Sequence, residues 1–270
     1  MQSDNPLIVQ SDRTLLLDIH APLSQDCRNA LIPFAELISS PEHLHTYALT
    51  PLSLWNAASA GFTSGQAIEV LKKYSRYDLP QSVVVWIQET ADRFGKLRLV
   101  PGPVRKSDTG IDEEFLYLVS TSPYVYKEIS CNPIAKKLLN PTNYSTEGIP
   151  ENAAELTEDE KKYCFLLNLT DRGTVKQNLL KIGWPVKDDV PLGQVWTREQ
   201  IRDLREYIES HGLRWSVVEG LPVTETIKYG GPDRDQQLEV YRQSLRNLAA
   251  EGIRTVCYNF MPVLDWARTD

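Results

Sequence analysis

The stretch Lys181-Ile-Gly-Trp-Pro-Val-Lys-Asp-Asp-Val-Pro-Leu-Gly-Gln-Val-Trp196 decides the fold of this chain, because two different patterns of secondary structure meet in it. On its N-terminal side, short helices and apolar strand-like runs follow one another without regular alternation. On its C-terminal side, helices and strands alternate. Gly183 and Pro185 end the helix that leads into this junction, since glycine closes helices and proline cannot continue one. We therefore predict two domains, Met1–Asp188 and Asp189–Asp270.

Length and composition are those of an ordinary globular protein. The chain has 270 residues, of which 41% are hydrophobic and 24% charged, enough for one large domain or two smaller ones. The formal net charge of −7 offers no whole-chain basic field for nucleic acid, although net charge does not exclude a local basic face. The first residues lack a signal-peptide pattern, and no apolar run approaches the ~20 residues of a membrane span. We expect a cytoplasmic protein without a membrane partner.

Cysteines and histidines are scattered, which argues against a metal centre. The four cysteines form no CxxC pair, so we expect reduced thiols. His43-Leu-His45 places two histidines close together in the sequence. With no cysteine or third histidine near them, two histidines on a strand or at a helix end are the simpler interpretation. No metal site is predicted.

The N-terminal side of the junction predicts strands mixed with short helices. Leu7-Ile-Val9 and Thr14-Leu-Leu-Leu17 flank a turn and are typical of paired strands. Apolar residues recur at helical spacing from Gln25 to Ile38. Helices are also expected from Thr50-Pro51 to Gly61, from Ser64 to Tyr74 and from Gln81 to Gly95, and strands over Lys96–Val100 and Phe115–Val119. This order predicts an α+β domain with winged-helix-like helices plus strands.

Three longer motifs lie in this region: Ser40-Pro-Glu-His-Leu-His-Thr-Tyr47, Thr50-Pro-Leu-Ser-Leu-Trp-Asn56 and Asp171-Arg-Gly-Thr-Val-Lys-Gln-Asn-Leu-Leu-Lys-Ile-Gly-Trp-Pro185. With these motifs, of which the first two are the densest match, the region resembles the N-terminal, pre-motor domain of bacterial XPB-type DNA repair helicases. Coverage runs from Leu7 to about Asp188. The sequence contains no GxxxxGK[ST] loop to bind ATP phosphates. The resemblance therefore implies a non-catalytic accessory module that assists DNA handling.

Two charged segments precede the junction. Between Thr146 and Lys162 the chain is acidic, and we expect a solvated linker or helix face there, without the apolar surroundings that would shift a pKa. Asp171–Ile182 predicts an amphipathic helix with Val175, Leu179 and Ile182 inward. Its cations are candidate DNA-phosphate contacts, with solvated charges on a helix exterior as the simpler alternative: Arg172, Lys176 and Lys181.

Beyond the junction, the pattern predicts a parallel α/β arrangement. Thr197-Arg-Glu-Gln200 is a capping box that opens a helix with Ile201, Leu204 and Ile208 inward. Arg214–Glu219 is a predicted strand. A helix over Asp235–Ala250 and a strand over Arg254–Phe260 follow. This rhythm is typical of a parallel sheet or TIM-type barrel, of which only a partial α/β fragment is present.

The same region contains three specific motifs: Val190-Pro-Leu-Gly-Gln-Val-Trp196, Val217-Val-Glu-Gly-Leu-Pro-Val223 and Tyr258-Asn-Phe-Met-Pro-Val-Leu-Asp-Trp-Ala-Arg-Thr-Asp270. In these motifs it resembles mannonate dehydratases of the UxuA type. That family is a TIM-barrel lyase that dehydrates D-mannonate with Mn²⁺ or Fe²⁺. The resemblance places three candidate substrate residues on the barrel rim, unless they only shape a βα loop: Asn259, Asp265 and Arg268.

The family's metal ligands lie on later strands, so we expect no dehydratase metal in this chain unless missing residues supply the site. His211 at a helix end and Cys257 in a strand expected to be buried do not replace those ligands. The main hypothesis is thus a DNA-helicase accessory module fused to an incomplete dehydratase fragment, not an enzyme as it stands. The alternatives are a mannonate dehydratase by descent, inactive as this chain stands, and a product of an accidental fusion without selected function. Weak DNA binding and self-association through exposed barrel-fragment edges are expected.

Overall fold

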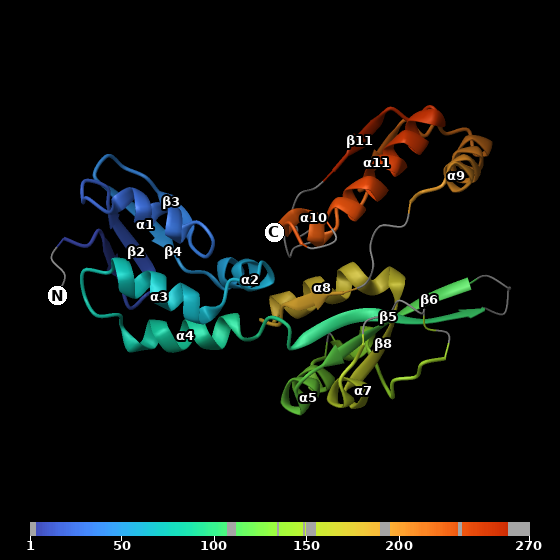
Figure 1. Ribbon diagram of the computed structural model, residues 1–270. Coiled ribbons are helices and arrows are strands. Elements are labelled where there is room, and N and C mark those ends of the chain that lie inside the picture. The colour runs from blue at the N-terminus through green and yellow to red at the C-terminus, as the bar shows by residue number, and fades with distance from the viewer. Residues whose placement is uncertain are drawn as a thin grey trace. The chain divides into compact units, whose positions relative to one another are not determined.

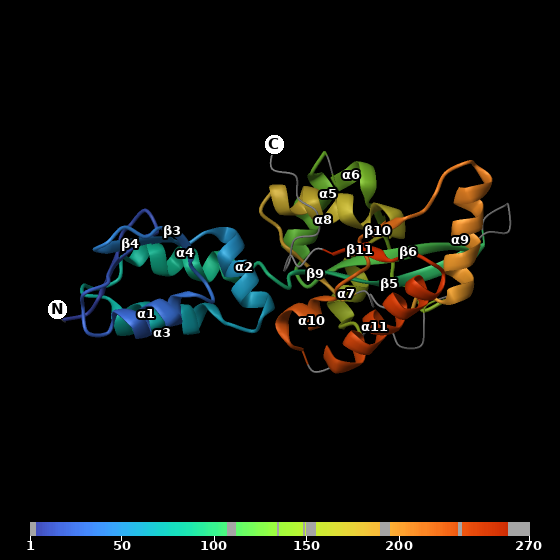
Figure 2. The same ribbon diagram turned by 90° about the horizontal axis from the view of Figure 1, so that it is seen from above.

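The chain forms two compact units, Met1–Asp189 and Val190–Asp270. The computed structural model describes residues 4–106, 112–133, 135–147, 149, 155–189, 195–231 and 234–258. Figures 1 and 2 show the arrangement of helices and strands within each unit. Within the described ranges, no helix is both long enough and apolar enough to cross a bilayer.

The first unit begins with a four-stranded antiparallel sheet in the order β1-β2-β4-β3. Its strands are β1 (Leu7–Val9), β2 (Thr14–Asp18), β3 (Glu36–Ser39) and β4 (Leu44–Ala48). The predicted pairing of the first two apolar runs is confirmed by the register Leu7↔Leu17. Leu15 and Leu17 alternate inward along β2 and are fully buried, because one face of this sheet is covered and the other is not.

Four helices complete this part: α1 (Ser24–Leu31), α2 (Pro51–Ser59), α3 (Ser64–Tyr74) and α4 (Gln81–Ala91). Thr50 caps α2 through its hydroxyl, which accepts a hydrogen bond from the Ser53 amide at 3.0 Å. The side chains Ala67, Ile68 and Leu71 on α3 are buried as their spacing predicted. These helices and the sheet bury one apolar core around Leu31, Phe34, Leu71 and Ile87.

The prediction of a single helix from Gln25 to Ile38 is wrong. α1 ends at Leu31, and Ile38 lies in the edge strand β3 with 60% of its side chain exposed. Pro33 explains the break, since proline has no amide hydrogen for the helix ladder and its ring clashes with the preceding turn. The apolar spacing continued across the proline by coincidence.

A second, five-stranded sheet occupies the rest of the first unit in the order β7-β8-β6-β5-β9. Its strands are β5 (Leu97–Lys106), β6 (Asp112–Ser120), β7 (Asn140–Thr142), β8 (Cys164–Asn168) and β9 (Val186–Asp188). All pairs are antiparallel except β5–β9, which is parallel and pairs Leu97 with Val186. The last strand of the sheet therefore comes from the junction itself.

Four helices and a 3₁₀ turn accompany this second sheet: α5 (Pro123–Cys131), α6 (Ala135–Leu138), α7 (Glu158–Lys162), α8 (Arg172–Lys181) and the turn Leu169–Asp171. Figure 2 shows α5, α6 and α8 grouped together, and α6 contacts both of the others. The inward residues Val175 and Leu179 of α8 are buried as predicted. The first unit is thus a mixed α and β structure with two sheets.

The second unit contains α9 (Arg198–Ser210), β10 (Val217–Glu219), α10 (Glu225–Tyr229), α11 (Arg234–Ala250) and β11 (Thr255–Cys257). β10 and β11 are parallel neighbours, which confirms the predicted parallel pairing. Thr197 forms the predicted capping box with Gln200. Ile201, Val218, Leu221, Leu248 and Ile253 form the core.

Two burial predictions for the second unit are wrong. Cys257 is exposed, and Leu204 is 46% exposed. In β10, Val218 is buried while Val217 and Glu219 are exposed, and in β11 Cys257 lies on the open side. The described part of this unit covers only one face of the strand pair, as expected for a fragment of a parallel α/β structure.

Candidate functional site

The junction brings two consecutive aspartates to the end of β9. Gly183 closes α8 with a φ of +85°, a backbone conformation that glycine adopts without strain. Trp184 follows, is 7% exposed, and donates its indole N–H to Glu128 at 2.8 Å. The Arg93 guanidinium lies 5.1 Å from the centre of that indole ring and donates to the Gly183 carbonyl at 3.0 Å. β9 is thereby placed beside β5, with Asp188 and Asp189 directed to different partners.

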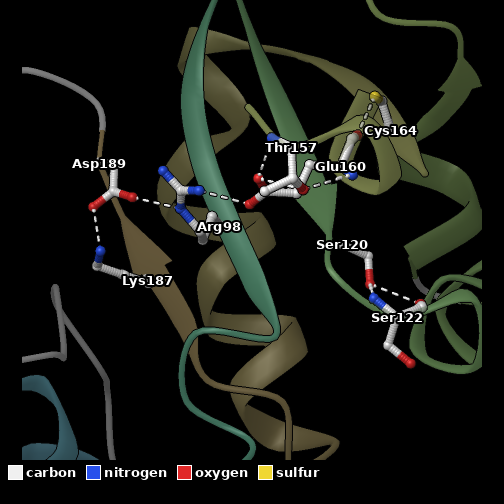
Figure 3. Close-up of polar contacts among 8 residues, drawn as sticks. All are labelled: Arg98, Ser120, Ser122, Thr157, Glu160, Cys164, Lys187 and Asp189. Atoms are coloured by element: carbon white, nitrogen blue, oxygen red, sulfur yellow. Dashed lines mark hydrogen bonds and ion pairs between the residues drawn. The ribbon is translucent and has the colours of Figure 1, made fainter. Parts of the chain in front are cut away.

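Asp189 belongs to a network centred on Arg98 of β5 (Figure 3). The Arg98 Nε donates to Asp189 at 2.7 Å, and its Nη1 donates to Glu160 of α7 at 2.6 Å. Lys187 contacts the other Asp189 oxygen at 3.3 Å. The Arg98 guanidinium therefore binds two carboxylates that lie 62 residues (Glu160) and 91 residues (Asp189) further along the sequence.

Glu160 is held from two sides. Its side chain is 1% exposed and also accepts hydrogen bonds from the Thr157 amide at 2.9 Å and the Thr157 hydroxyl at 3.0 Å, which forms the capping box of α7. Burial opposes ionisation of this carboxyl, but the hydrogen bonds from Thr157 and Arg98 outweigh it and hold the pKa of Glu160 below its ordinary value of 4.5. The expectation that the acidic segment between Thr146 and Lys162 is solvated, without surroundings that shift a pKa, is thus wrong at Glu160.

Asp188 pairs with two cations of α8. The Arg172 guanidinium contacts both carboxylate oxygens, at 2.9 Å from Nε and 2.8 Å from Nη2, and Lys176 contacts the carboxylate at 2.9 Å. The exposed fractions of these side chains are 3% for Asp188, 12% for Arg172 and 13% for Lys176. The prediction that Arg172 and Lys176 lie on a solvated helix exterior is therefore wrong, because β9 covers that side of α8.

The chemistry of this charge network is that of a structural clamp. Its carboxylates are paired with cations, and the lowered pKa of Glu160 leaves that carboxyl unsuited to exchanging a proton near neutral pH. Burial raises the pKa of the neighbouring Cys164 thiol to about 11, and that thiol donates to the Glu160 carbonyl at 2.9 Å. A thiol of this kind is a poor nucleophile.

Acid should weaken the first unit partly through Glu160. A carboxyl whose pKa is lowered on folding stabilises the fold above its unfolded value of 4.5, and this contribution is lost as pH falls through the lower folded pKa. We expect Glu160→Gln to lower the urea midpoint at pH 7 and to make its decline between pH 5 and pH 3 shallower than in the wild type. Glu158→Gln, at an exposed pair with Lys161, is the matched control and should change the midpoint little. Parallel pH profiles for Glu160→Gln and wild type would contradict this role.

The predicted site residues have different surroundings in the structure, and some lie outside the described residues. Lys181 is exposed at the end of α8, whereas Arg172 and Lys176 are paired with Asp188. Asn259, Asp265 and Arg268 lie outside the described residues. Sequence reasoning missed Arg98, Glu160, Asp188 and Asp189, although Thr157-Glu-Asp-Glu160 carries the same capping-box signal that was used at Thr197.

A family model described as "Helicase conserved C-terminal domain" matches residues 7–142, half of the chain. The chain belongs to this helicase-domain family. A DNA 3'-5' helicase XPB of Kineococcus radiotolerans is 39% identical over 186 residues, which are 69% of this chain and 29% of that helicase. The helicase-domain match confirms the resemblance in the first unit.

Residues 173–270 match a second family model, described as D-mannonate dehydratase (UxuA). A mannonate dehydratase of Streptococcus uberis is 58% identical over 82 residues, 30% of this chain and 24% of that enzyme. The crystal structure of a mannonate dehydratase from Streptococcus suis serotype 2 shares 44% identity, covers 35% of this chain and 28% of that one, and has a TM-score of 0.28. The chain spans less than a third of each relative's length.

Residues 173–189 lie within the dehydratase match, but in the structure they complete the helicase-like unit. α8 packs its apolar face inward, β9 pairs with β5, and Asp188 and Asp189 neutralise cations of the first unit. If this segment belonged to the other unit, the pairing of β9 with β5 and two ion pairs, Arg98–Asp189 and Arg172–Asp188, would be lost. The first compact unit therefore extends through Asp189.

The described residues of the second unit do not fit a dehydratase metal. The ring Nδ1 of His211 lies 2.9 Å from the Tyr207 carbonyl at the end of α9, and Cys257 lies on β11. Throughout the described ranges, no three His, Cys, Asp or Glu side chains are placed to hold one ion.

Proposed function

We infer that this protein is a non-catalytic accessory module of the XPB helicase type, which contacts DNA through its first unit in the cytoplasm. The observation that carries this proposal is the identity of 39% to a DNA 3'-5' helicase over 186 residues, nearly all of the first unit. The 270 residues include no phosphate-binding loop of the GxxxxGK[ST] type, so ATP-driven work would come from other sequence. In the same proposal, helices α2–α4 act as a winged-helix-like element.

The proposed DNA-contact surface, here named the lysine surface, consists of Lys136 and Lys137 on α6 and Lys181 on α8. The two helices pack together through Leu138, Leu139 and Leu179, so these exposed lysines lie on adjoining elements. Among the described residues, their ammonium groups have no carboxylate partner, unlike Arg172 and Lys176. Unpaired lysines can release counterions from DNA phosphates, which supplies sequence-independent affinity.

Reversing the three charges of the lysine surface should abolish most of the DNA affinity. We expect Lys136→Glu, Lys137→Glu and Lys181→Glu together to weaken binding of a fluorescent single-stranded 20-mer by at least tenfold at low salt. Loss of three phosphate contacts should also reduce the slope of log K against log salt concentration by about 2. Fluorescence anisotropy titrations at several salt concentrations measure both quantities.

The matched control makes the same change in net charge elsewhere on the first unit. Lys72→Glu, Lys73→Glu and Lys96→Glu reverse three exposed lysines that lie outside the lysine surface. This control should lose little affinity. An equal loss in both triple variants would assign binding to net charge alone, and a wild-type chain that binds no DNA would reject the proposed function.

A second candidate rests on the 58% identity of the C-terminal part to a mannonate dehydratase. In that proposal the second unit is a barrel fragment that associates with further copies or with missing barrel sequence, through apolar side chains left exposed: Leu204, Tyr207, Leu213 and Val217. The DNA-contacting module is preferred because the helicase relative matches 69% of this chain, whereas the dehydratase relative matches 30%. Dehydration of D-mannonate by the purified chain with Mn²⁺ would reverse that preference.

A further inference from the structure

Two histidines far apart in the sequence meet at the end of the first sheet. His20 follows β2 and His43 precedes β4, and their ring nitrogens Nε2 and Nδ1 lie 2.9 Å apart. The ring centroids are 5.2 Å apart and the ring planes are inclined by 47°. Both side chains are exposed, so each can reorient without disturbing the core. This pair is different from His43-Leu-His45, the one suggested by sequence spacing.

The backbone holds both histidines in place. Asp18 pairs with Leu44 in the antiparallel register of β2 and β4, and the Ile19 amide donates to the His43 carbonyl at 3.3 Å. The His20 amide donates to the Asp18 carboxylate at 3.1 Å. The rings therefore approach each other on a fixed strand end. Only their side-chain torsions need to change for both lone pairs to converge on one ion.

The distance between the two nitrogens matches a particular coordination geometry. Two nitrogens in cis positions of an octahedral or square-planar ion, each about 2.1 Å from the metal, are separated by about 3.0 Å. A tetrahedral ion with the same bonds would need about 3.3–3.4 Å. The observed 2.9 Å, the length of the hydrogen bond between the rings, is compatible with the cis arrangement. Nickel and copper ions adopt such geometries and bind imidazole well, whereas magnesium and calcium prefer oxygen.

We propose that His20 and His43 form a bidentate site for a divalent transition-metal ion of the nickel or copper class. The ion replaces the proton shared between the two rings, binds Nε2 of His20 and Nδ1 of His43, and keeps water in its other positions. Two neutral rings carry one proton each, and in the complex these protons lie on the distal nitrogens, Nδ1 of His20 and Nε2 of His43. The bridging proton therefore moves to the other nitrogen of its own ring, and no net proton is released. The pair lies at the β2–β4 end of the first sheet, whereas the lysine surface lies on α6 and α8.

Titration of the untagged full-length chain with NiCl₂, followed by isothermal calorimetry at pH 7.5, tests the site. The wild type should bind one ion per chain. His20→Gln and His43→Gln should each weaken nickel binding by about a hundredfold, because a chelate becomes a single imidazole. The matched control is His211→Gln, since His211 is an exposed histidine of the second unit, and it should bind nickel like the wild type.

Two further measurements keep the result decisive. Thermal melting of each variant should agree with the wild type, since the replaced side chains are exposed. Cys131→Ser with Cys257→Ser removes the two exposed thiols and should leave nickel binding unchanged. Nickel binding that survives in both His20→Gln and His43→Gln, or that disappears with the thiols or with His211, would overturn the proposal.

Discussion

A chain that ends at Gly183 should fail to fold the second sheet of its first unit, whereas a chain that ends at Asp189 should fold it. The six residues between these ends supply β9, the buried indole of Trp184, and the carboxylates Asp188 and Asp189. Without them Arg98 keeps only Glu160, and Arg172 and Lys176 lose their counterion in a covered position. An uncompensated buried charge costs about 3–5 kcal/mol, a large fraction of the 5–15 kcal/mol that stabilises a typical domain.

Far-UV circular dichroism and amide hydrogen exchange on the two truncated chains measure this difference. In the chain ending at Gly183, amides of β5 and β6 should exchange rapidly, while those of β1, β2 and β4 should stay protected. The chain ending at Asp189 serves as the control, because it differs only by the junction residues. Equal protection of β5 in both chains would mean that β9 and its aspartates are dispensable.

Replacing Asp188 with alanine in the full chain should lower the free energy of unfolding of the first unit by about 3–5 kcal/mol. The carboxylate is 3% exposed and neutralises two cations that are themselves mostly covered, so its removal leaves both without a partner. Urea unfolding followed by fluorescence of Trp184, which lies next to β9, measures the loss.

Asp159→Ala is the control for that experiment. Asp159 is 64% exposed and pairs with Lys162 at 3.6 Å on the surface of α7. A surface pair of this kind contributes about 0–1 kcal/mol, so the urea midpoint should barely change. A shift for Asp188→Ala no larger than that of Asp159→Ala would show that water reaches Arg172 and Lys176 and replaces the carboxylate.

Local signals were enough to predict most elements. Thr50-Pro51 fixed the start of α2, apolar spacing predicted α3 and α8, and the capping box at Thr197 opened α9 where the structure has it. These signals act within one or two helical turns, so a single sequence displays them directly. The capping box of α7 at Thr157 has the same local character and could also have been found.

The charge network could not be predicted, because its members meet only in the folded sheet. β9 has three residues, too few for any periodicity, and its partner β5 lies nearly ninety residues earlier. Nothing local distinguishes Arg98 or Asp188 from a surface charge. The same limit explains the burial predicted for Cys257, which depended on which faces the tertiary structure covers. The helix predicted through Ile38 is a different case, because Pro33 is a local signal against it.

The parallel pairing of β5 with β9 has a consequence for synthesis on the ribosome. The β1-β2-β4-β3 sheet and its helices are complete once Ala91 has emerged, but β5, which ends at Lys106, gains its last neighbour only after Val186. At about 5–20 residues per second, those eighty intervening residues take roughly 4–16 s to translate. For that time Leu97–Leu99 of β5, the residues that pair with β9, have no strand partner on that edge. This edge is where a nascent-chain chaperone would be needed most.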